Sequence, residues 1–512
     1  FLVPVFFLLS IGIAILYNLG SNYFLGEVSY ITKALTAVLQ LGVTMDYSIF
    51  LLNSFEENKR RFSNDKIAAM GYAIADTFRS IVGSSVTTIA GFAALCFMTF
   101  ALGRDLGIVM AKGVIIGVLC CVTLLPAMIL TFDKQIERTA HRPLIKSVDG
   151  VSGFLTKHYK IWTAVFLILL VPAVYGNDHT QVYYNIAQSL PDSLPSNVAA
   201  QKLEEDFDMN TVYMIMMDKN IEAKDKIAMM NAIDEVDGIK WCISMRSLVG
   251  PAVPDSMIPK DIKGMLQSGN TELAFLCSEY DAATPQINDQ IQEVTRITKS
   301  YDSSSMVIGE APLMKDLERV TDVDIQNVNI ASVLAIFVII LLVFKSVSLP
   351  VILVSVIEFA IAVNMAVPFY QDTSLPFVAS IVIGTIQLGA TVDYAIVMTS
   401  RYIRERKDGK GKWEAVRTAH KTNMLSIITS ALSLFAATYG VACYSQVDMI
   451  GSICTLLARG AIISMVVVVT LLPAMFLIFD KVSCKTTLGM GNLVGKKKQG
   501  VSAIQKIRED EK

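Results

Sequence analysis

The stretch QLGVTMDY at residues 40–47 places an aspartate inside an otherwise apolar run, and it recurs as QLGATVDY at residues 387–394. The second copy lies 347 residues after the first, and six of the eight letters are identical. A charged carboxylate within a bilayer costs about 2.5–3.5 kcal/mol on insertion scales. Two such carboxylates at matching positions, each followed by tyrosine, indicate a shared function.

The composition is that of a membrane protein. Of 512 residues, 53% are hydrophobic and 18% are charged, whereas soluble domains are about 25% charged. Stretches of about 20 apolar residues can cross a bilayer. The sequence has ten of them, at residues 1–20, 30–52, 80–99, 107–131, 159–176, 328–347, 350–370, 376–399, 423–442 and 451–479.

The positions of Lys and Arg predict the orientation. Residues 53–80, 133–160, 401–421 and 480–512 hold 27 of the 44 basic residues. Ten consecutive crossings place all four segments on one side, which the positive-inside rule assigns to the cytoplasm. Residues 178–327, with 25 acidic and 12 basic side chains, then lie outside.

An internal repeat extends beyond the opening octapeptide. Residues 111–134 end in VTLLPAMILTFDK, and residues 458–481 end in VTLLPAMFLIFDK. Internal repeats are common in transporters, and both Asp-bearing stretches enter from outside, so the repeat is parallel. The second copy follows an extra helix, an external segment and another helix. The symmetry predicts the same three elements upstream of Phe1, which would make the chain N-terminally truncated.

The predicted fold is a membrane all-α bundle of ten transmembrane helices in two parallel pseudo-repeats, with an extracytoplasmic α/β ferredoxin-like domain. In that domain the order strand, helix, strand, strand, helix, strand fits a split βαβ unit. The predicted divisions are a first transmembrane repeat at 1–132, a cytoplasmic linker at 133–158, a transmembrane helix at 159–176, the α/β domain at 177–327, a second repeat at 328–480 and a basic cytoplasmic tail at 481–512.

The paired carboxylates predict proton binding and release. Burial favours the neutral form of a carboxylate, and a second carboxylate nearby favours it further. Asp46 and Asp393 are therefore predicted to carry protons. Tyr47 and Tyr394 lie about 100° further round each helix and are predicted to hydrogen-bond the opposite aspartate.

Small and hydroxyl-bearing residues are predicted to support this pair. Gly42 and Gly389 precede each aspartate by four residues, share its helix face and allow a neighbouring helix to approach closely. The similar stretches SSVTTIAG and SIITSALS supply predicted hydroxyl partners: Ser84, Thr87, Thr88, Ser426, Thr429 and Ser430. The alternative is a structural polar knot that fixes helix register without moving protons.

Two interpretations are open for each of the remaining ionisable side chains in the apolar stretches and for the two cysteines of the external segment. Glu358 is either an auxiliary proton or substrate site, or a solvated structural group. Lys112 and Arg459 either extend outward to the membrane surface or counter the aspartate charges. Cys242 and Cys277 share the external segment and are either a disulfide pair or free thiols.

The duplicated GxxxDY pattern, the paired LLPAM helix ends and the external α/β segment resemble the resistance-nodulation-division superfamily, and within it the MMPL (mycobacterial membrane protein large) family. The resemblance implies a secondary active transporter whose external domain is a porter domain. It implies export of lipids or other hydrophobic compounds across the bacterial cytoplasmic membrane, driven by the proton-motive force.

No nucleotide-binding loop, HExxH motif or Ser/His/Asp arrangement occurs in the sequence, so we expect neither an enzyme nor a cofactor or metal site. The expected partners are membrane lipids, a hydrophobic substrate and protons, with no nucleic acid. The sequence leaves open a homo-oligomer or an accessory protein. An alternative function is a proton-coupled conformational helper, or a sterol-sensing-like protein, that acts on a partner protein.

Overall fold

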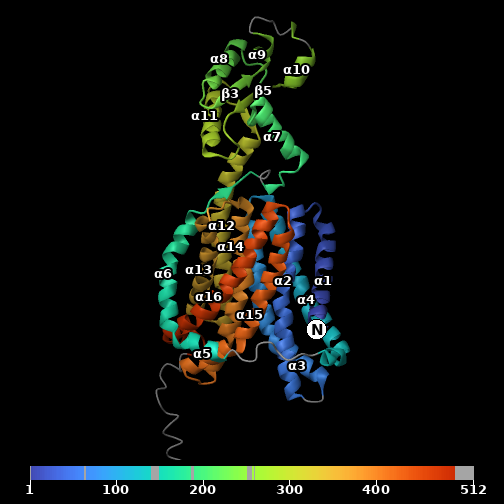
Figure 1. The fold of residues 1–512 in the computed structure, drawn as a ribbon, viewed down its shortest axis with the longest axis vertical. Coiled ribbons are helices and arrows are strands. Elements are labelled where there is room, and N and C mark those ends of the chain that lie inside the picture. The colour runs from blue at the N-terminus through green and yellow to red at the C-terminus, as the bar shows by residue number, and fades with distance from the viewer. Residues whose placement is uncertain are drawn as a thin grey trace, which may run out of the picture. The chain divides into compact units, whose positions relative to one another are not determined.

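The computed structural model describes residues 2–62, 65–139, 149–185, 189–250, 257–258 and 260–490. The chain divides into two compact units (Figure 1). The helical unit is drawn from residues 1–182, 324–445 and 449–512, and the α/β unit from residues 183–323 and 446–448.

Ten helices of the described chain are long and apolar enough to cross a membrane, which confirms the predicted count. They are α1 (Leu2–Ser21), α2 (Tyr30–Arg61), α3 (Lys66–Ala94), α4 (Ala101–Arg138), α6 (Tyr159–Asp178), α12 (Glu310–Phe344), α13 (Ser348–Tyr370), α14 (Phe377–Lys407), α15 (Lys412–Tyr444) and α16 (Asp448–Thr486). The chain is thus a multi-pass membrane protein.

Several of these helices extend beyond their predicted apolar stretches. Helix α3 begins at Lys66 instead of residue 80, and α12 begins at Glu310 instead of residue 328. Apolar length marks only the part of a helix that lies in hydrocarbon, whereas backbone hydrogen bonding continues through polar residues. The predicted boundaries therefore underestimate the lengths of these helices.

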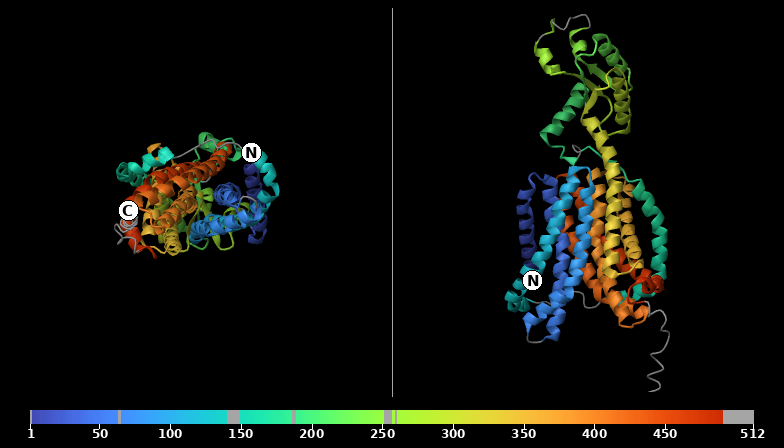
Figure 2. Two further views of the ribbon diagram at one scale, coloured as in Figure 1. Left: turned by 90° about the horizontal axis from the view of Figure 1, so that it is seen from below. Right: turned by 180° about the vertical axis from the view of Figure 1, so that it is seen from behind.

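The packing of the helices defines two halves, which we call the first half (α1–α4) and the second half (α13–α16). Within the first half, α4 packs against α1, α2 and α3; in the second, α14 packs against α13 and α15. Two further contacts join the halves, α3 with α14 and α2 with α15. Figure 2 shows α1 and α6 at opposite edges of the bundle.

Short elements connect the long helices. They are the 3-10 helices η1 (Asn22–Leu25) and η2 (Leu95–Phe97), the two-stranded sheet of β1 (Val182–Tyr183) and β7 (Leu375–Pro376), and α5 (Asp149–Lys157). Helix α5 falls in the stretch expected as a cytoplasmic linker. It is fixed to α15 by His420, whose Nδ1 lies 2.8 Å from Ser152 Oγ.

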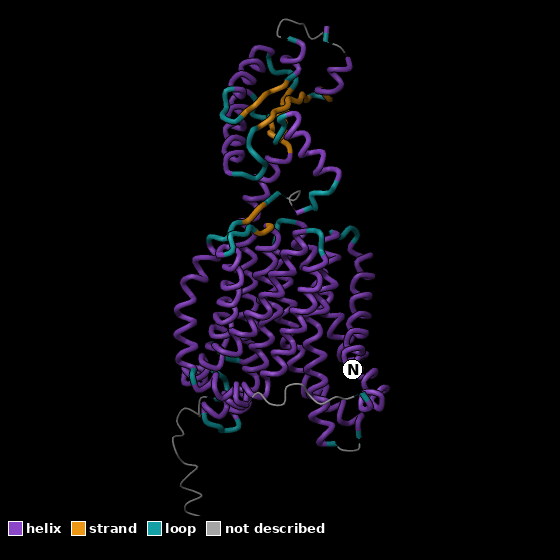
Figure 3. The backbone as a smooth tube through the Cα atoms, viewed as in Figure 1, coloured by secondary structure: helices purple, strands orange, loops and turns teal. Residues whose placement is uncertain are grey.

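Strands are concentrated in the α/β unit (Figure 3). Its elements are α7 (Pro195–Phe207), β2 (Thr211–Asp218), α8 (Ala223–Asp234), β3 (Ile239–Ile243), α9 (Met245–Val249), α10 (Lys260–Leu266), β4 (Gln267–Ser268), β5 (Thr271–Ser278), α11 (Pro285–Tyr301) and β6 (Met306–Gly309). The strand order is β3-β5-β2-β6, each neighbouring pair is antiparallel, and β4 pairs with β5.

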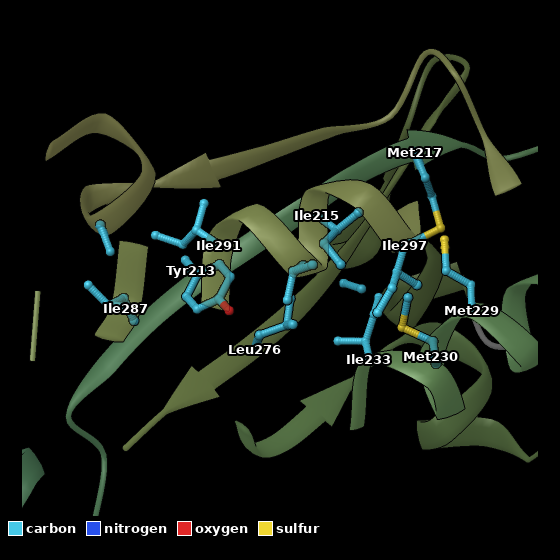
Figure 4. Packing of buried hydrophobic residues seen from close by; sticks show 13 residues of the cluster. Tyr213, Ile215, Met217, Met229, Met230, Ile233, Leu276, Ile287, Ile291 and Ile297 are labelled. Carbon is cyan, nitrogen blue, oxygen red and sulfur yellow. The ribbon is translucent and has the colours of Figure 1, made fainter. Parts of the chain in front are cut away.

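The core of the α/β unit follows from the alternation of β2. Tyr213, Ile215 and Met217 are buried on one face of that strand, because successive side chains of a strand point to opposite faces. They pack with buried residues of α8 and α11 (Figure 4). One face of the sheet is therefore covered by these two helices.

Cys242 and Cys277 are free thiols. Cys242 lies opposite Leu276 in the β3–β5 register, and both pack in the core beneath α8 and α11. Cys277 follows Leu276 directly, so its side chain points to the other face of the sheet. A disulfide between the two would have to pass through the sheet, which settles the interpretation in favour of free thiols.

Candidate functional site

Asp46 lies on α2, where it is only 3% exposed. Helix α15 packs against α2, and the hydroxyl of its Ser430 lies close enough to the Asp46 carboxylate to act on it as a polar neighbour. Neither Asp46 Oδ1 nor Ser430 Oγ has a well-formed hydrogen bond among the described residues. Gly42 lets α15 come close, since a Cβ there would stand 2.3 Å from Leu434 Cδ1.

Asp393 lies on α14 and is 1% exposed. It faces the hydroxyls of α3, where Thr87 Oγ1 donates to Asp393 Oδ1 over 3.5 Å. Ser84 and Thr88 interact with the same carboxylate. Thr88 Oγ1 also donates to Gly389 O over 3.0 Å, which ties α3 to α14 one turn before the aspartate.

Each carboxylate thus lies beside at least one hydroxyl of the opposite half of the bundle. Asp46 belongs to the first half and meets α15 of the second, whereas Asp393 belongs to the second half and meets α3 of the first. The two aspartates also interact electrostatically with one another. Any change in the charge of either group therefore acts on the interface between the halves.

The two tyrosines occupy the same interface. Tyr47 and Tyr394 are fully buried. Asp393 has the stronger electrostatic influence on Tyr47, and Asp46 has the stronger influence on Tyr394. The predicted hydrogen bonds to the opposite aspartates are not formed, because neither phenol has a partner among the described residues. The phenols lie near the opposite carboxylates without bonding them.

The predicted hydroxyls of α15 divide between different environments. Ser430 is buried and faces Asp46. Ser426 instead accepts a hydrogen bond of 3.0 Å from Asn53. Thr429 is exposed, and its hydroxyl donates to Leu425 O of its own helix. Of these three, the structure brings only Ser430 to the aspartate.

Four buried polar atoms around the pair lack a hydrogen bond among the described residues: Asp46 Oδ1, Tyr47 OH, Tyr394 OH and Ser430 Oγ. Buried polar groups nearly always have a partner, and exceptions often mark a functional role. Carboxylates, phenols and hydroxyls can each donate or accept a proton. The arrangement can therefore bind protons and exchange bonding partners within the membrane.

A sequence model of the MMPL family matches residues 1–164 and 188–493. The chain belongs to the MMPL family. It is similar to membrane protein YdfJ of Bacillus subtilis, with 21% identity over 442 residues that cover 81% of this chain and 58% of YdfJ. It is also similar to membrane protein MJ1562 of Methanocaldococcus jannaschii, with 31% identity over 144 residues, 28% of this chain and 35% of that protein.

A third relative is probable transport protein MmpL12 of Mycobacterium tuberculosis, with 24% identity over 244 residues. That match covers 44% of this chain and 20% of MmpL12. This MMPL chain thus matches less than two thirds of the length of each of these relatives.

Glu358 is not brought to the aspartate pair of this MMPL chain. It lies half-buried on α13 and is not among the groups that act electrostatically on Asp46, Asp393 or the two tyrosines. The described residues also contain no group of three or more His, Cys, Asp or Glu that could hold a metal ion.

Ion pairs at the basic ends of the helices are a feature that sequence reasoning missed. Lys59 Nζ of α2 lies 2.8 Å from Asp133 Oδ1 of α4. At the corresponding place in the second half, Asp480 accepts a hydrogen bond of 3.2 Å from Arg406 and one of 2.7 Å from the hydroxyl of Tyr402. Lys66 also binds Asp133, which raises the pKa of this lysine. The sequence repeat could have indicated these ion pairs. Lys59 and Arg406 are 347 residues apart, and so are Asp133 and Asp480.

Proposed function

We propose that this MMPL chain couples the proton-motive force to export of lipids or other hydrophobic compounds across the bacterial cytoplasmic membrane. The observation that carries the proposal is the crossed arrangement of Asp46 and Asp393. Asp393 accepts a hydrogen bond from Thr87 of the first half, and Asp46 lies beside the hydroxyl of Ser430 of the second half. Support for transport also comes from MmpL12, a relative that is named a transport protein.

Protonation supplies the driving change in this mechanism. An ionised carboxylate accepts hydrogen bonds from hydroxyls strongly, and a neutral one does so more weakly. Proton binding at Asp393 would weaken its attraction to Thr87 on α3, and proton binding at Asp46 would do the same toward Ser430 on α15. The two halves would then shift against one another. The hydroxyls of Tyr47 and Tyr394, which have no hydrogen-bond partner among the described residues, would form new hydrogen bonds.

The two halves are proposed to be parallel pseudo-repeats. The constant sequence offset of 347 supports this, as do the ion pairs of Lys59 with Asp133 and of Arg406 with Asp480. A related pair of halves suits a rocking motion about a shared central interface.

The α/β unit is proposed to be an extracytoplasmic, ferredoxin-like porter domain that contacts the substrate. Its strand order β3-β5-β2-β6 and the helices α8 and α11 on one face support a split βαβ arrangement. The positive-inside distribution of Lys and Arg supports its placement outside, with the C-terminal tail in the cytoplasm.

Proton flux in vesicles tests this proposal. The purified chain is reconstituted in liposomes that contain a pH-sensitive dye, and a pH gradient is imposed. We expect flux that is lost in both Asp46→Asn and Asp393→Asn. Persistence of wild-type flux in either variant would exclude the relay, and identification of co-purified lipid by mass spectrometry would narrow the substrate class.

A further inference from the structure

A second polar cluster lies in the first half, six residues before Asp46 along α2. Asn18 of α1 donates from Nδ2 to Gln40 Oε1 over 2.9 Å and to Val109 O over 3.2 Å. Gln40 of α2 donates to Gly113 O over 3.0 Å. Both amide side chains are fully buried. We call Asn18 and Gln40 the first amide clamp, because they join α1, α2 and α4.

The same bonds recur in the second half. Asn364 of α13 donates from Nδ2 to Gln387 Oε1 over 2.8 Å and to Leu456 O over 2.9 Å. Gln387 of α14 donates to Gly460 O over 3.4 Å and to Ser464 Oγ over 3.0 Å. Asn364 and Gln387 form the second amide clamp, which joins α13, α14 and α16.

A basic side chain completes each clamp. Lys112 Nζ donates to Asn18 O over 3.1 Å and to Asn22 Oδ1 over 2.6 Å. Arg459 donates to Asn364 Oδ1 over 2.8 Å and to Asn364 O over 2.9 Å. The two cations therefore neither extend freely to the surface nor bond to the aspartate pair, but hold the asparagines in place.

Two glycines make room for the clamps. A Cβ on Gly113 would stand 2.5 Å from Asn18 Nδ2, and one on Gly460 would stand 2.6 Å from Gln387 Oε1. Both distances are below any normal carbon contact, so any larger residue would displace the amides. The backbone is shaped for the amide pair in both halves.

The clamps lie on the same helices as the aspartates but on another face. Gln40 precedes Asp46 by six residues, and Gln387 precedes Asp393 by six. Six residues correspond to about 9 Å along a helix and to about 120° round it. Each of these helices thus turns its glutamine toward its own half and its aspartate toward the other half.

We propose that the two amide clamps are positioning groups for the proton-carrying carboxylates, which fix each aspartate-bearing helix to its own half so that Asp46 and Asp393 move with opposite halves. The inference rests on the proposed proton-coupled function. It explains why buried amides, which are costly unless fully bonded, occur at matching places on both of these helices.

The asparagine oxygens of the two clamps differ in their bonding. Asn364 Oδ1 accepts a bond from Arg459, whereas Asn18 Oδ1 has no partner among the described residues. Helix α14 is also the most buried of the ten membrane helices. Disruption of the second clamp should therefore have the larger effect.

Matched glycine variants test the proposal in the same dye-loaded liposomes. Gly113→Ala and Gly460→Ala displace the clamps, whereas Gly12→Ala and Gly440→Ala add a Cβ into open space on helices of the same bundle. We expect about a tenfold to hundredfold loss of flux per folded protein in the first two, as for misplaced reacting groups. We also expect a displaced pH profile of flux, with the larger effects in Gly460→Ala and no change in the controls.

An exchange of the amides separates positioning from simple stability. Gln40→Asn alone shortens the clamp, and Asn18→Gln with Gln40→Asn restores its total length. A positioning role predicts that the double variant regains most of the flux and the wild-type pH profile. Thermal unfolding midpoints are measured in parallel, so that flux is compared at equal amounts of folded protein.

The outcomes distinguish this inference from the proposed function. If wild-type flux depends on both aspartates but the clamp variants match the glycine controls in flux and pH profile, the positioning role is wrong and the function stands. If the wild-type chain carries no flux that depends on Asp46 and Asp393, the proposed function fails and this inference fails with it.

Discussion

Gly91 of α3 lies against Gly389 of α14, so that a Cβ on Gly91 would stand 3.1 Å from Gly389 Cα and 3.3 Å from Thr385 O. This contact joins the two halves one turn before Asp393. Since both nearest atoms belong to backbone, added volume cannot be absorbed by a side-chain rotation. The halves meet here with backbone against backbone.

Gly91→Ala should therefore destabilise the helical unit by about 1–3 kcal/mol, as overpacking of close contacts generally does. Gly71→Ala is the matched control, because it lies on the same helix with no atom within 4 Å of its Cβ. The unfolding midpoint in detergent is the measurement. Equal midpoints for the two variants would show that the halves are not in close contact at Gly91.

Two threonines at corresponding places in the sequence should behave differently. Thr87 donates to Asp393, whereas Thr429 is exposed and bonds within its own helix. We expect Thr87→Val to lower proton flux by about tenfold or more, since a hydrogen bond to a charged group is worth about 1.5–3 kcal/mol, and Thr429→Val to leave it unchanged. A loss of flux in both variants, or in neither, would contradict the crossed arrangement.

A buried ion pair should dominate the stability of the α/β unit. Lys226 Nζ lies 2.6 Å from Glu272 Oε2, and the two side chains are 8% and 2% exposed. Lys226→Met leaves a buried carboxylate without its counter-charge and should cost about 3–5 kcal/mol. Lys226→Met with Glu272→Leu should regain most of that loss, since apolar pairs replace buried ion pairs well.

Fluorescence of Trp241 on β3 can follow this unfolding once Trp162 and Trp413, the other two of the three tryptophans, are changed to Phe. If Lys226→Met were as stable as the parent protein, the ion pair of Lys226 and Glu272 would be hydrated and not buried.

The thiol of Cys242 should be nearly unreactive in the folded protein. Burial raises its pKa to about 12 from an ordinary value of 9.0. A raised pKa lowers the fraction of reactive thiolate, by about a thousandfold at pH 8 for a shift of this size. Iodoacetamide labelling should therefore be slow at pH 8, rise about tenfold with each pH unit, and become fast on denaturation.

Mass spectrometry of the unreduced protein gives the second part of this measurement. We expect Cys242 and Cys277 as two thiols, because they point to opposite faces of the sheet. A peptide pair joined by a disulfide, or rapid labelling at pH 8, would contradict this placement.

The sequence predicted the membrane helices well because their signal is local. A stretch of apolar residues must be in hydrocarbon, so the count of ten and the burial of Asp46 and Asp393 could be predicted from composition alone. The predicted order strand, helix, strand, strand, helix, strand matches β2, α8, β3, β5, α11 and β6. Helices α7, α9 and α10 and strand β4 were not predicted. The residues paired between strands were not predicted either, since pairing depends on residues far apart in the chain.

The environment of each polar side chain was harder to predict. Ser84 and Ser426 occupy aligned places, as do Thr87 and Thr429, but Thr87 is buried against Asp393 whereas Thr429 is exposed. A one-residue change in offset turns a helix by about 100°, which is enough to move Thr429 out of the site. The amide clamps were missed because Asn and Gln carry no charge, although Gln40 and Gln387 are the first letters of the repeated octapeptide.

Infrared difference spectroscopy on the purified protein tests the central claim most directly, because it detects carboxyl groups that gain and lose protons. A pH step across the range in which flux begins should give a band of protonated carboxyl that is reduced in Asp46→Asn and in Asp393→Asn. A wild-type band that persists in full in both aspartate variants would contradict the account, since the protons would then bind elsewhere.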